Sequence, residues 1–130
     1  MTLTLGLDVG TQGTKGLVVD ADAGRVVARA SVGYGLIEGL PPGHAEQHPH
    51  LWRDAVRVVV AELLADPAVD VERLAAVGVS GQQHGCVLLG EDDEPVRAAK
   101  LWCDTATVDE AAELGVATGF TASKVLYTRR

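Results

Sequence analysis

The segment LTLGLDVGTQGTKGLVVD, residues 3–20, decides the fold at the start of the chain. Two apolar runs within it, Leu3–Leu7 and Gly16–Val19, have the length and β-branched content of buried strands. The glycines and threonines between them are typical of a tight turn. This pattern predicts a β-hairpin whose first strand ends at a single carboxylate, Asp8.

The turn of this hairpin has the composition of a phosphate-binding loop. Because glycine has no side chain to block the approach, successive backbone N–H groups can reach a phosphate. Asp8 would repel phosphate itself, but it can hold Mg²⁺ against phosphate oxygens, and Lys15 can neutralise phosphate charge. An ordinary hairpin with a glycine-rich loop and a solvated lysine explains the same residues. Other segments of the sequence must therefore decide between a phosphate-binding loop and an ordinary turn.

Composition narrows the class of protein. The chain has 130 residues, 47% of them apolar, which suits one globular unit, and its formal charge of −7 argues against binding to nucleic acid or an anionic membrane. Cys86 and Cys103 fit neither a zinc-ligand pattern nor a disulfide scaffold, and we expect both to be small core residues. Without a signal sequence or a membrane-spanning run, the sequence predicts a cytoplasmic protein with free thiols.

Downstream of the hairpin, strand and helix patterns alternate. Arg25–Val32 alternates as the third strand of an antiparallel meander, and Gly33–Pro49 has the composition of a surface loop. A helix is predicted from Pro49, with apolar residues recurring every four positions, to Asp66–Pro67. The wholly apolar run Leu74–Ser80 is typical of a buried central strand.

Shorter patterns describe the rest of the chain. We expect a helical turn at Val71–Leu74, strands at Cys86–Leu89 and Ala99–Trp102, and helices at Asp109–Val116 and Thr121–Arg130. This order of elements predicts an α/β fold with a mixed β-sheet.

Two polar segments follow predicted strands. Gly81–Gly85 (GQQHG) can donate and accept hydrogen bonds to a polyol, while Trp102 and Asp104 can offer a sugar an apolar face and an acceptor. A plain connection, a core tryptophan and a helix-capping aspartate explain them equally well. The histidines at positions 44, 48 and 50 have no carboxylate pattern beside them, so we do not predict a metal site there.

Five motifs in one order resemble the N-terminal part of the FGGY carbohydrate kinases, xylulokinase-like members above all: LGLDVGTQGTKGLVVD, GHAEQHPHLW, AAVGVSGQQHG, AKLWCDTAT and GFTASKVLY. The resemblance implies an actin-like ATPase fold. Residues 1–130 would be the N-terminal part of the first of two ribonuclease-H-like domains, with the second domain absent from this chain.

The resemblance also implies roles for particular residues. Asp8 would assist Mg²⁺, and the loop around the ATP phosphates would consist of Gly10, Thr11, Gln12, Thr14 and Lys15. Gln83 and His84 match residues that contact the sugar, and Trp102 and Asp104 match a further part of the sugar-side wall. The sequence departs from the family pattern at His44, where a tryptophan is common, and at Ala106, where many members have arginine.

The implied activity is ATP-dependent phosphorylation of a sugar hydroxyl, with D-xylulose favoured by the SGQQHG segment. The resemblance places the general-base aspartate and the adenosine pocket beyond Arg130, so we expect no catalytic residue and no activity in residues 1–130 alone. Expected partners are a small-molecule sugar and, in the full-length protein, a second copy. The alternatives are a kinase for another ketose or polyol, a non-catalytic actin-like sugar- or nucleotide-binding protein, and a structural fragment.

Overall fold

The computed structural model describes all residues from Met1 to Arg130. The chain divides into two compact units, which we describe separately. The first unit comprises Met1–Gly35 and His50–Gly81, and the second comprises Leu36–Pro49 and Gln82–Arg130. No helix is both long enough and apolar enough to cross a membrane.

The first unit begins with the predicted antiparallel meander. Strand β1 (Leu3–Val9) pairs with β2 (Gly13–Asp20), which in turn pairs with β3 (Arg25–Gly33). The register places Asp8 opposite Lys15. The prediction from residues 3–20 is therefore confirmed, and the third strand with it.

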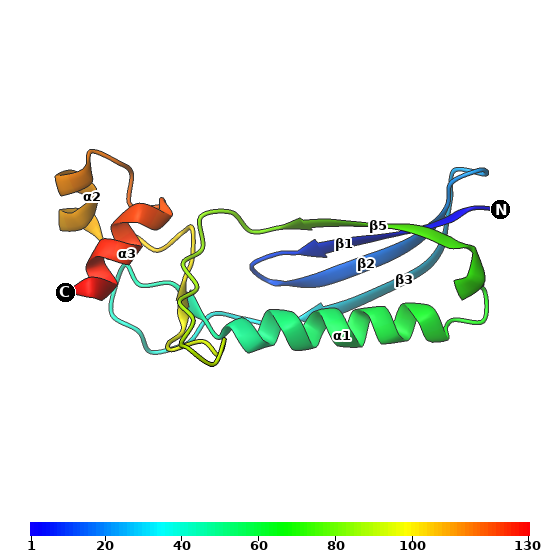
Figure 1. Ribbon diagram of the computed structural model, residues 1–130, viewed down its shortest axis with the longest axis horizontal. Coiled ribbons are helices and arrows are strands. Elements are labelled where there is room, and N and C mark those ends of the chain that lie inside the picture. The colour runs from blue at the N-terminus through cyan, green and yellow to red at the C-terminus, as the bar shows by residue number, and fades with distance from the viewer. The chain divides into compact units, whose positions relative to one another are not determined.

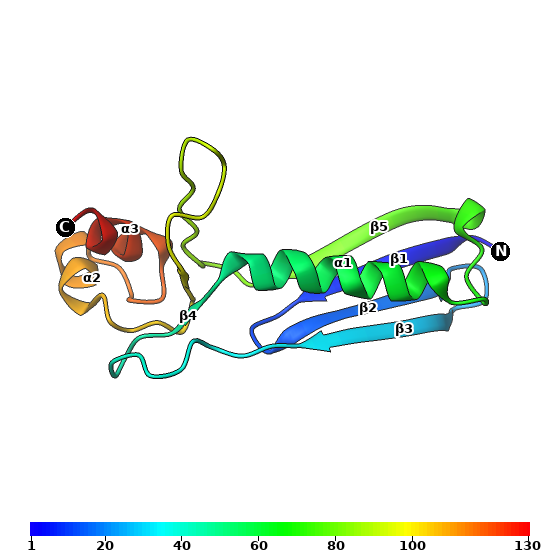
Figure 2. The same cartoon turned by 90° about the horizontal axis from the view of Figure 1, so that it is seen from below.

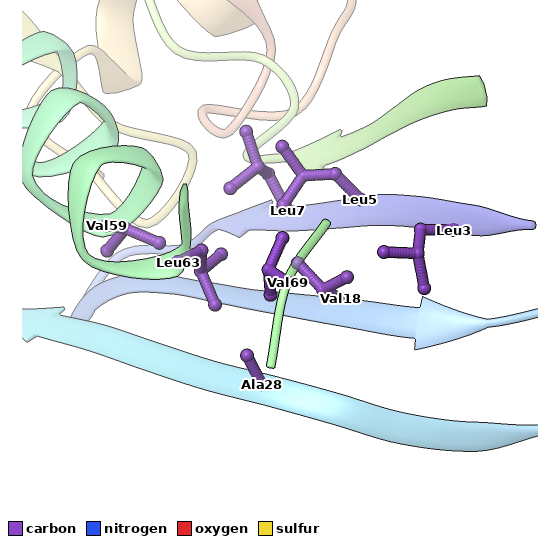
Figure 3. Close-up of a cluster of buried hydrophobic side chains, with 8 residues drawn as sticks. All are labelled: Leu3, Leu5, Leu7, Val18, Ala28, Val59, Leu63 and Val69. Carbon is purple, nitrogen blue, oxygen red and sulfur yellow. The ribbon is translucent and has the colours of Figure 1, made fainter. Parts of the chain in front are cut away.

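Helix α1 (Pro49–Ala65) lies along one face of this sheet (Figures 1 and 2). Its buried residues are Ala55, Val59 and Leu63, spaced four apart as the sequence pattern predicts. Val59 and Leu63 pack with residues from β1, β2 and β3 in the cluster of Figure 3: Leu3, Leu5, Leu7, Val18 and Ala28.

Gly16 allows the helix to approach the sheet closely. A Cβ added at Gly16 would lie 2.6 Å from Val59 Cγ1 and 2.7 Å from Leu63 Cδ1. The glycine that the sequence places in a strand therefore serves helix-on-sheet packing, and any side chain there would overpack the core.

Strand β5 (Leu74–Gly81) follows the short 3₁₀ helix η1 (Val71–Arg73) and runs parallel to β1. The strand order β3-β2-β1-β5 makes β5 an edge strand, with Val77 58% and Val79 69% exposed. The prediction of a buried central strand was therefore wrong for its position. An apolar run indicates a strand, but burial depends on a neighbour on each side, and β5 pairs only with β1.

We expect the 130-residue chain to self-associate at high concentration, because β5 presents an unpaired edge with exposed valines. Sedimentation velocity over a concentration series should show species larger than the monomer. A Val77→Lys/Val79→Lys variant should shift the distribution toward monomer, since edge lysines oppose strand pairing. A wild-type chain that remains monomeric at the highest concentration would contradict this prediction.

The second unit has little regular structure. Its strands β4 (Glu46–Gln47) and β6 (Ala99–Lys100) pair with each other, and its helices are α2 (Val108–Leu114) and α3 (Thr121–Arg129). Both helices are confirmed, with α2 ending at Gly115 in the left-handed conformation.

Two predictions for the second unit were wrong in detail. The predicted loop 33–49 contains buried β4, and the predicted strand Cys86–Leu89 forms only isolated bridges, from Cys86 to Lys100 and from Leu89 to Pro95. Strand β4 pairs with β6, about fifty positions further along the chain, and the bridges of Cys86 and Leu89 reach residues about ten positions away. Local composition does not reveal either pairing.

Candidate functional site

The predicted phosphate loop connects β1 and β2 in the first unit. The Gly10 N–H donates to the Gly13 carbonyl oxygen at 3.0 Å, which closes a tight turn. Gly13 has no room for a side chain, because an added Cβ would lie 2.6 Å from the Val32 carbonyl oxygen. The compact loop that the sequence indicated is therefore present.

Tyr34, just after β3, contacts this loop three times. Its hydroxyl donates to the Gly10 carbonyl oxygen at 2.8 Å and lies 3.1 Å from Thr14 Oγ1, and its N–H donates to the Gln12 carbonyl oxygen at 3.1 Å. Thr14 is fully buried. No sequence pattern singled out Tyr34, since its proximity to the loop follows from the pairing of Gly13 with Gly33 between β2 and β3.

Asp8 and Lys15 lie exposed on the sheet face opposite α1. They line a depression of about 390 Å³ together with Arg29 of β3 and with Gly6, Leu7 and Leu17. Arg29 is a cation that the sequence patterns did not single out. One exposed carboxylate with two cations nearby suits Mg²⁺ and phosphate, because Mg²⁺ commonly uses one or two carboxylates together with phosphate oxygens and waters.

Gln83 and His84 are exposed in the second unit. His84 has a φ of 56°, a left-handed conformation that is uncommon for a non-glycine residue. Its ring packs against Phe120 with a centroid separation of 4.6 Å and an interplanar angle of 31°.

Lys124 of α3 holds the backbone of His84. Its fully buried ammonium donates to the His84 carbonyl oxygen at 2.9 Å and also to the Gly119 carbonyl oxygen. Burial lowers the pKa of the Lys124 ammonium. A lysine in a helical sequence pattern is normally expected to be exposed to solvent, so the contact of Lys124 with the His84 backbone was not predicted.

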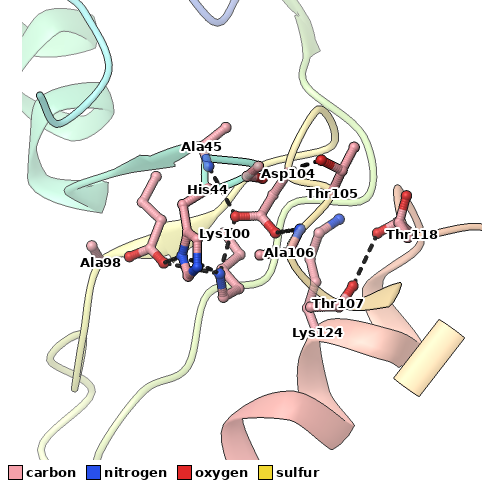
Figure 4. A network of polar contacts seen from close by, with 12 residues as sticks. His44, Ala45, Ala98, Lys100, Asp104, Thr105, Ala106, Thr107, Thr118 and Lys124 are labelled. Atoms are coloured by element: carbon pink, nitrogen blue, oxygen red, sulfur yellow. Dashed lines mark hydrogen bonds and ion pairs between the residues drawn. The ribbon is translucent and has the colours of Figure 1, made fainter. Parts of the chain in front are cut away.

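Asp104 lies in a buried polar network rather than at the surface (Figure 4). Its Oδ2 accepts from the Ala45 N–H at 2.9 Å and from Lys100 Nζ at 3.0 Å, and its Oδ1 accepts from the Ala106 N–H at 3.1 Å. The neighbouring Trp102 is 51% exposed. The structure thus gives Asp104 a structural function, and its place in the sugar-side wall stays a prediction.

Lys100 is the centre of this network. Its ammonium, 1% exposed, lies 3.0 Å from Glu46 Oε1 and 3.3 Å from His44 Nδ1, and 4.7 Å from the centroid of the Tyr127 ring. Burial raises the pKa of the Glu46 carboxyl, but hydrogen bonds from Lys100 and Arg97 outweigh it and hold that pKa below its usual range.

His44 does have carboxylates beside it, contrary to the sequence analysis. Ligand atoms of His44, Glu46 and Asp104 lie within 4.8 Å of one another, a spacing that could hold a metal ion. The Lys100 ammonium is within 3.3 Å of an atom of each of these residues, so the cation among them is the lysine of the same chain.

Of the two cysteines, Cys86 is buried, as predicted, and Cys103 is partly buried. Burial raises the pKa of the Cys86 thiol, which disfavours the reactive thiolate. Cys86 is therefore a core residue.

Comparison with known proteins agrees with the motif order. Residues 3–126 match the N-terminal domain of the FGGY family of carbohydrate kinases. The chain is 34% identical to the xylulose kinase of Haemophilus influenzae over 148 aligned positions, covering 97% of this chain and 29% of that protein.

Solved structures give the same result. A kinase from Brucella ovis, described as a xyloylose kinase, superposes with a TM-score of 0.87 at 35% identity, covering 96% of this chain and 28% of that one. A gluconate kinase from Lactobacillus acidophilus superposes with a TM-score of 0.73 at 34% identity, covering 88% and 23%.

The chain therefore spans less than a third of the length of these relatives. Its fold is a mixed α/β, actin-like ATPase fold, as the resemblance implied. The matched family domain and the relatives agree in one assignment: the chain belongs to the FGGY family of carbohydrate kinases.

Proposed function

We propose that the protein containing this chain transfers the γ-phosphate of ATP to a sugar hydroxyl, with D-xylulose as substrate and xylulose 5-phosphate as product. Residues 1–130 would form the N-terminal part of the first of two domains. The observation that carries the proposal is the glycine-rich turn with exposed Asp8 and Lys15, in a chain related to xylulose kinases over 97% of its length.

In this mechanism the first unit handles the phosphates. Backbone N–H groups of the loop between β1 and β2 and the side chain of Lys15 would orient the β- and γ-phosphates, and Asp8 would hold Mg²⁺. The ion, when bound, neutralises charge that develops on the phosphate oxygens. Asp8 would not serve as the general base, because a carboxylate placed to organise phosphates is not placed to take the proton of the attacking hydroxyl.

The second unit would bind the sugar. Gln83 and His84 supply amide and imidazole groups that hydrogen-bond to hydroxyls, and Trp102 offers a half-exposed ring on which a sugar can pack. The base that accepts the hydroxyl proton and the adenosine pocket would lie outside residues 1–130. Catalysis would then depend on orienting the hydroxyl and the phosphate and on excluding water.

A second substrate class has one specific observation in its favour. The Lactobacillus acidophilus gluconate kinase is about as similar to this chain as the xylulose kinases are, at 34% identity. Kinetics of the full-length protein with a panel of ketopentoses, polyols and aldonic acids would decide between them. The highest kcat/KM for a compound other than D-xylulose would overturn our substrate assignment while leaving the kinase activity intact.

We predict that residues 1–130 alone release no ADP in a sugar-dependent manner. The reason is that the proposed base and adenosine pocket are not among these residues. A coupled assay for ADP with ATP, Mg²⁺ and D-xylulose would measure this, with the full-length protein as the positive control. Sugar-dependent turnover by the 130-residue chain would show that the catalytic base lies within it.

Replacing His84 with alanine in the full-length protein should raise the sugar KM by about tenfold or more, because a buried sugar hydroxyl would lose its partner. The KM for ATP should stay within about twofold, since the phosphate loop is untouched. His48→Ala, at another exposed histidine of the second unit, is the matched control and should change neither constant. An unchanged sugar KM in the His84→Ala variant would remove His84 from the site.

A further inference from the structure

The Tyr34 side chain and backbone connect the end of β3 to the phosphate loop. One residue thereby contacts three positions of the loop: Gly10, Gln12 and Thr14. The loop geometry thus depends on a residue twenty positions beyond Thr14.

The hydroxyl protons of Tyr34 and Thr14 define the direction of the hydrogen bonds between these residues and Gly10. A tyrosine hydroxyl has a single proton, and that of Tyr34 is donated to the Gly10 carbonyl oxygen. The oxygens of Tyr34 and Thr14 are 3.1 Å apart, so the Thr14 hydroxyl must be the donor between them. Its proton is therefore engaged within the protein, and the fully buried Thr14 hydroxyl has none left for a phosphate oxygen.

This arrangement matters because loops that bind phosphate through N–H groups must hold their carbonyl groups turned away from the ligand. Glycine gives the Gly10 backbone the widest choice of conformations, so a hydrogen-bond donor from outside the hairpin helps to select one. The Tyr34 hydroxyl donates to the Gly10 carbonyl oxygen, and the Tyr34 N–H donates to the Gln12 carbonyl oxygen. These two hydrogen bonds hold the carbonyl groups on both sides of the turn.

We propose that Tyr34 is a positioning residue for the phosphate loop, and that its hydroxyl, oriented by a hydrogen bond from Thr14, sets the affinity for the nucleotide phosphates without affecting the sugar. The inference rests on the proposed kinase function. It also changes the expected function of Thr14, whose side chain supports the loop through Tyr34 instead of contacting phosphate.

The decisive variant is Tyr34→Phe, which removes one hydroxyl and leaves the ring and the backbone N–H in place. In the full-length protein we expect the KM for ATP to rise about three- to tenfold, the effect of one neutral hydrogen bond, with the sugar KM unchanged. Tyr127→Phe, at the only other tyrosine of the chain, is the matched control and should leave the KM for ATP unchanged.

Two further measurements separate positioning from general stability. Hydrogen–deuterium exchange of the peptide spanning residues 8–14 should be faster in Tyr34→Phe than in wild type or Tyr127→Phe. Thr14→Val should raise the KM for ATP by less than Tyr34→Phe, and the double variant should equal Tyr34→Phe, because the Thr14 hydroxyl acts only through Tyr34.

The outcomes are distinguishable. Absence of sugar-dependent ATP consumption in the wild-type full-length protein would defeat the proposed function, while faster loop exchange in Tyr34→Phe would still support the structural part of the inference. A wild-type kinase with an unchanged KM for ATP in Tyr34→Phe would overturn the inference alone. Additive effects of Thr14→Val and Tyr34→Phe would show that the Thr14 hydroxyl contacts the ligand directly.

Discussion

Replacing Lys100 with methionine should lower the free energy of unfolding of the second unit by about 3 kcal/mol, the lower end of the range for breaking a buried ion pair. The ammonium, 1% exposed, lies 3.0 Å from a carboxylate oxygen of Glu46 and 3.0 Å from one of Asp104. Methionine has a side chain of similar length but no positive charge, so Glu46 and Asp104 both lose their ion pair with the ammonium. The cost should not be larger, because Arg97 still pairs with Glu46 at 2.8 Å and two backbone N–H groups still bind Asp104.

The two tryptophans allow this effect to be measured in the second unit alone. Trp52 is in α1 of the first unit and Trp102 is in the second. In a Trp52→Phe background, urea unfolding followed by fluorescence at low concentration therefore reports the surroundings of Trp102. The matched control is Arg130→Met, also in the second unit, which removes an ion pair of 3.0 Å with Glu110 whose arginine is 51% exposed. We expect the control to cost at most about 1 kcal/mol, because water screens exposed pairs.

The pH dependence provides an independent check of the Lys100 network. Because the pKa of Glu46 is held below its usual range, its ionised form stabilises the folded state fully above the unfolded pKa of about 4.3. That contribution is lost as the pH falls through the lowered folded pKa. Lys100→Met removes one cause of the lowering, so its stability should fall less steeply below about pH 4.3 than that of the wild type. Equal stability of the Lys100→Met variant and the wild type at neutral pH would contradict the network's contribution.

The elements that were predictable from sequence are those whose pattern and partners are local. The hairpin of residues 3–20 and its third strand pair with their neighbours along the chain, and α1 shows its buried face as a four-residue repeat. The same reasoning identified β5 as a strand but placed it in the centre of the sheet. An apolar run does not reveal how many strands will flank it.

The candidate site likewise contains local features that the sequence predicts and long-range contacts that it does not. The tight glycine turn and the exposed carboxylate at its edge, Asp8, could be predicted, because the glycine pattern and the end of the first apolar run are local features; their part in phosphate and magnesium chemistry stays a prediction. Tyr34, Lys100 and Lys124 could not, since each acts through a contact with residues that the fold brings together from distant positions. The buried contact of Asp104 with Lys100 could not be predicted either, and the proposed place of Asp104 in the sugar-side wall stays a prediction.

Replacing Asp8 with asparagine should reduce kcat of the full-length protein by about 100-fold or more, the largest kinetic effect that we expect from a single change in this chain. Asparagine retains the shape of the side chain but removes the negative charge that would hold Mg²⁺ beside the phosphates. The sugar KM should not change, because Asp8 is proposed to hold the metal and is not among the proposed sugar contacts. The Mg²⁺ concentration needed for half-maximal rate should rise.

Initial rates measured over a matrix of Mg²⁺ and ATP concentrations would test this expectation. Asp54→Asn is the matched control, since Asp54 is another exposed carboxylate of the first unit, on α1, and its ion pairs are with Arg53 and Arg57. The control should keep kcat and the Mg²⁺ requirement of the wild type. An Asp8→Asn enzyme that retains more than about half of kcat with an unaltered Mg²⁺ requirement would show that this carboxylate does not assist the metal, and the exposed face around Lys15 and Arg29 would then bind phosphate through its cations alone.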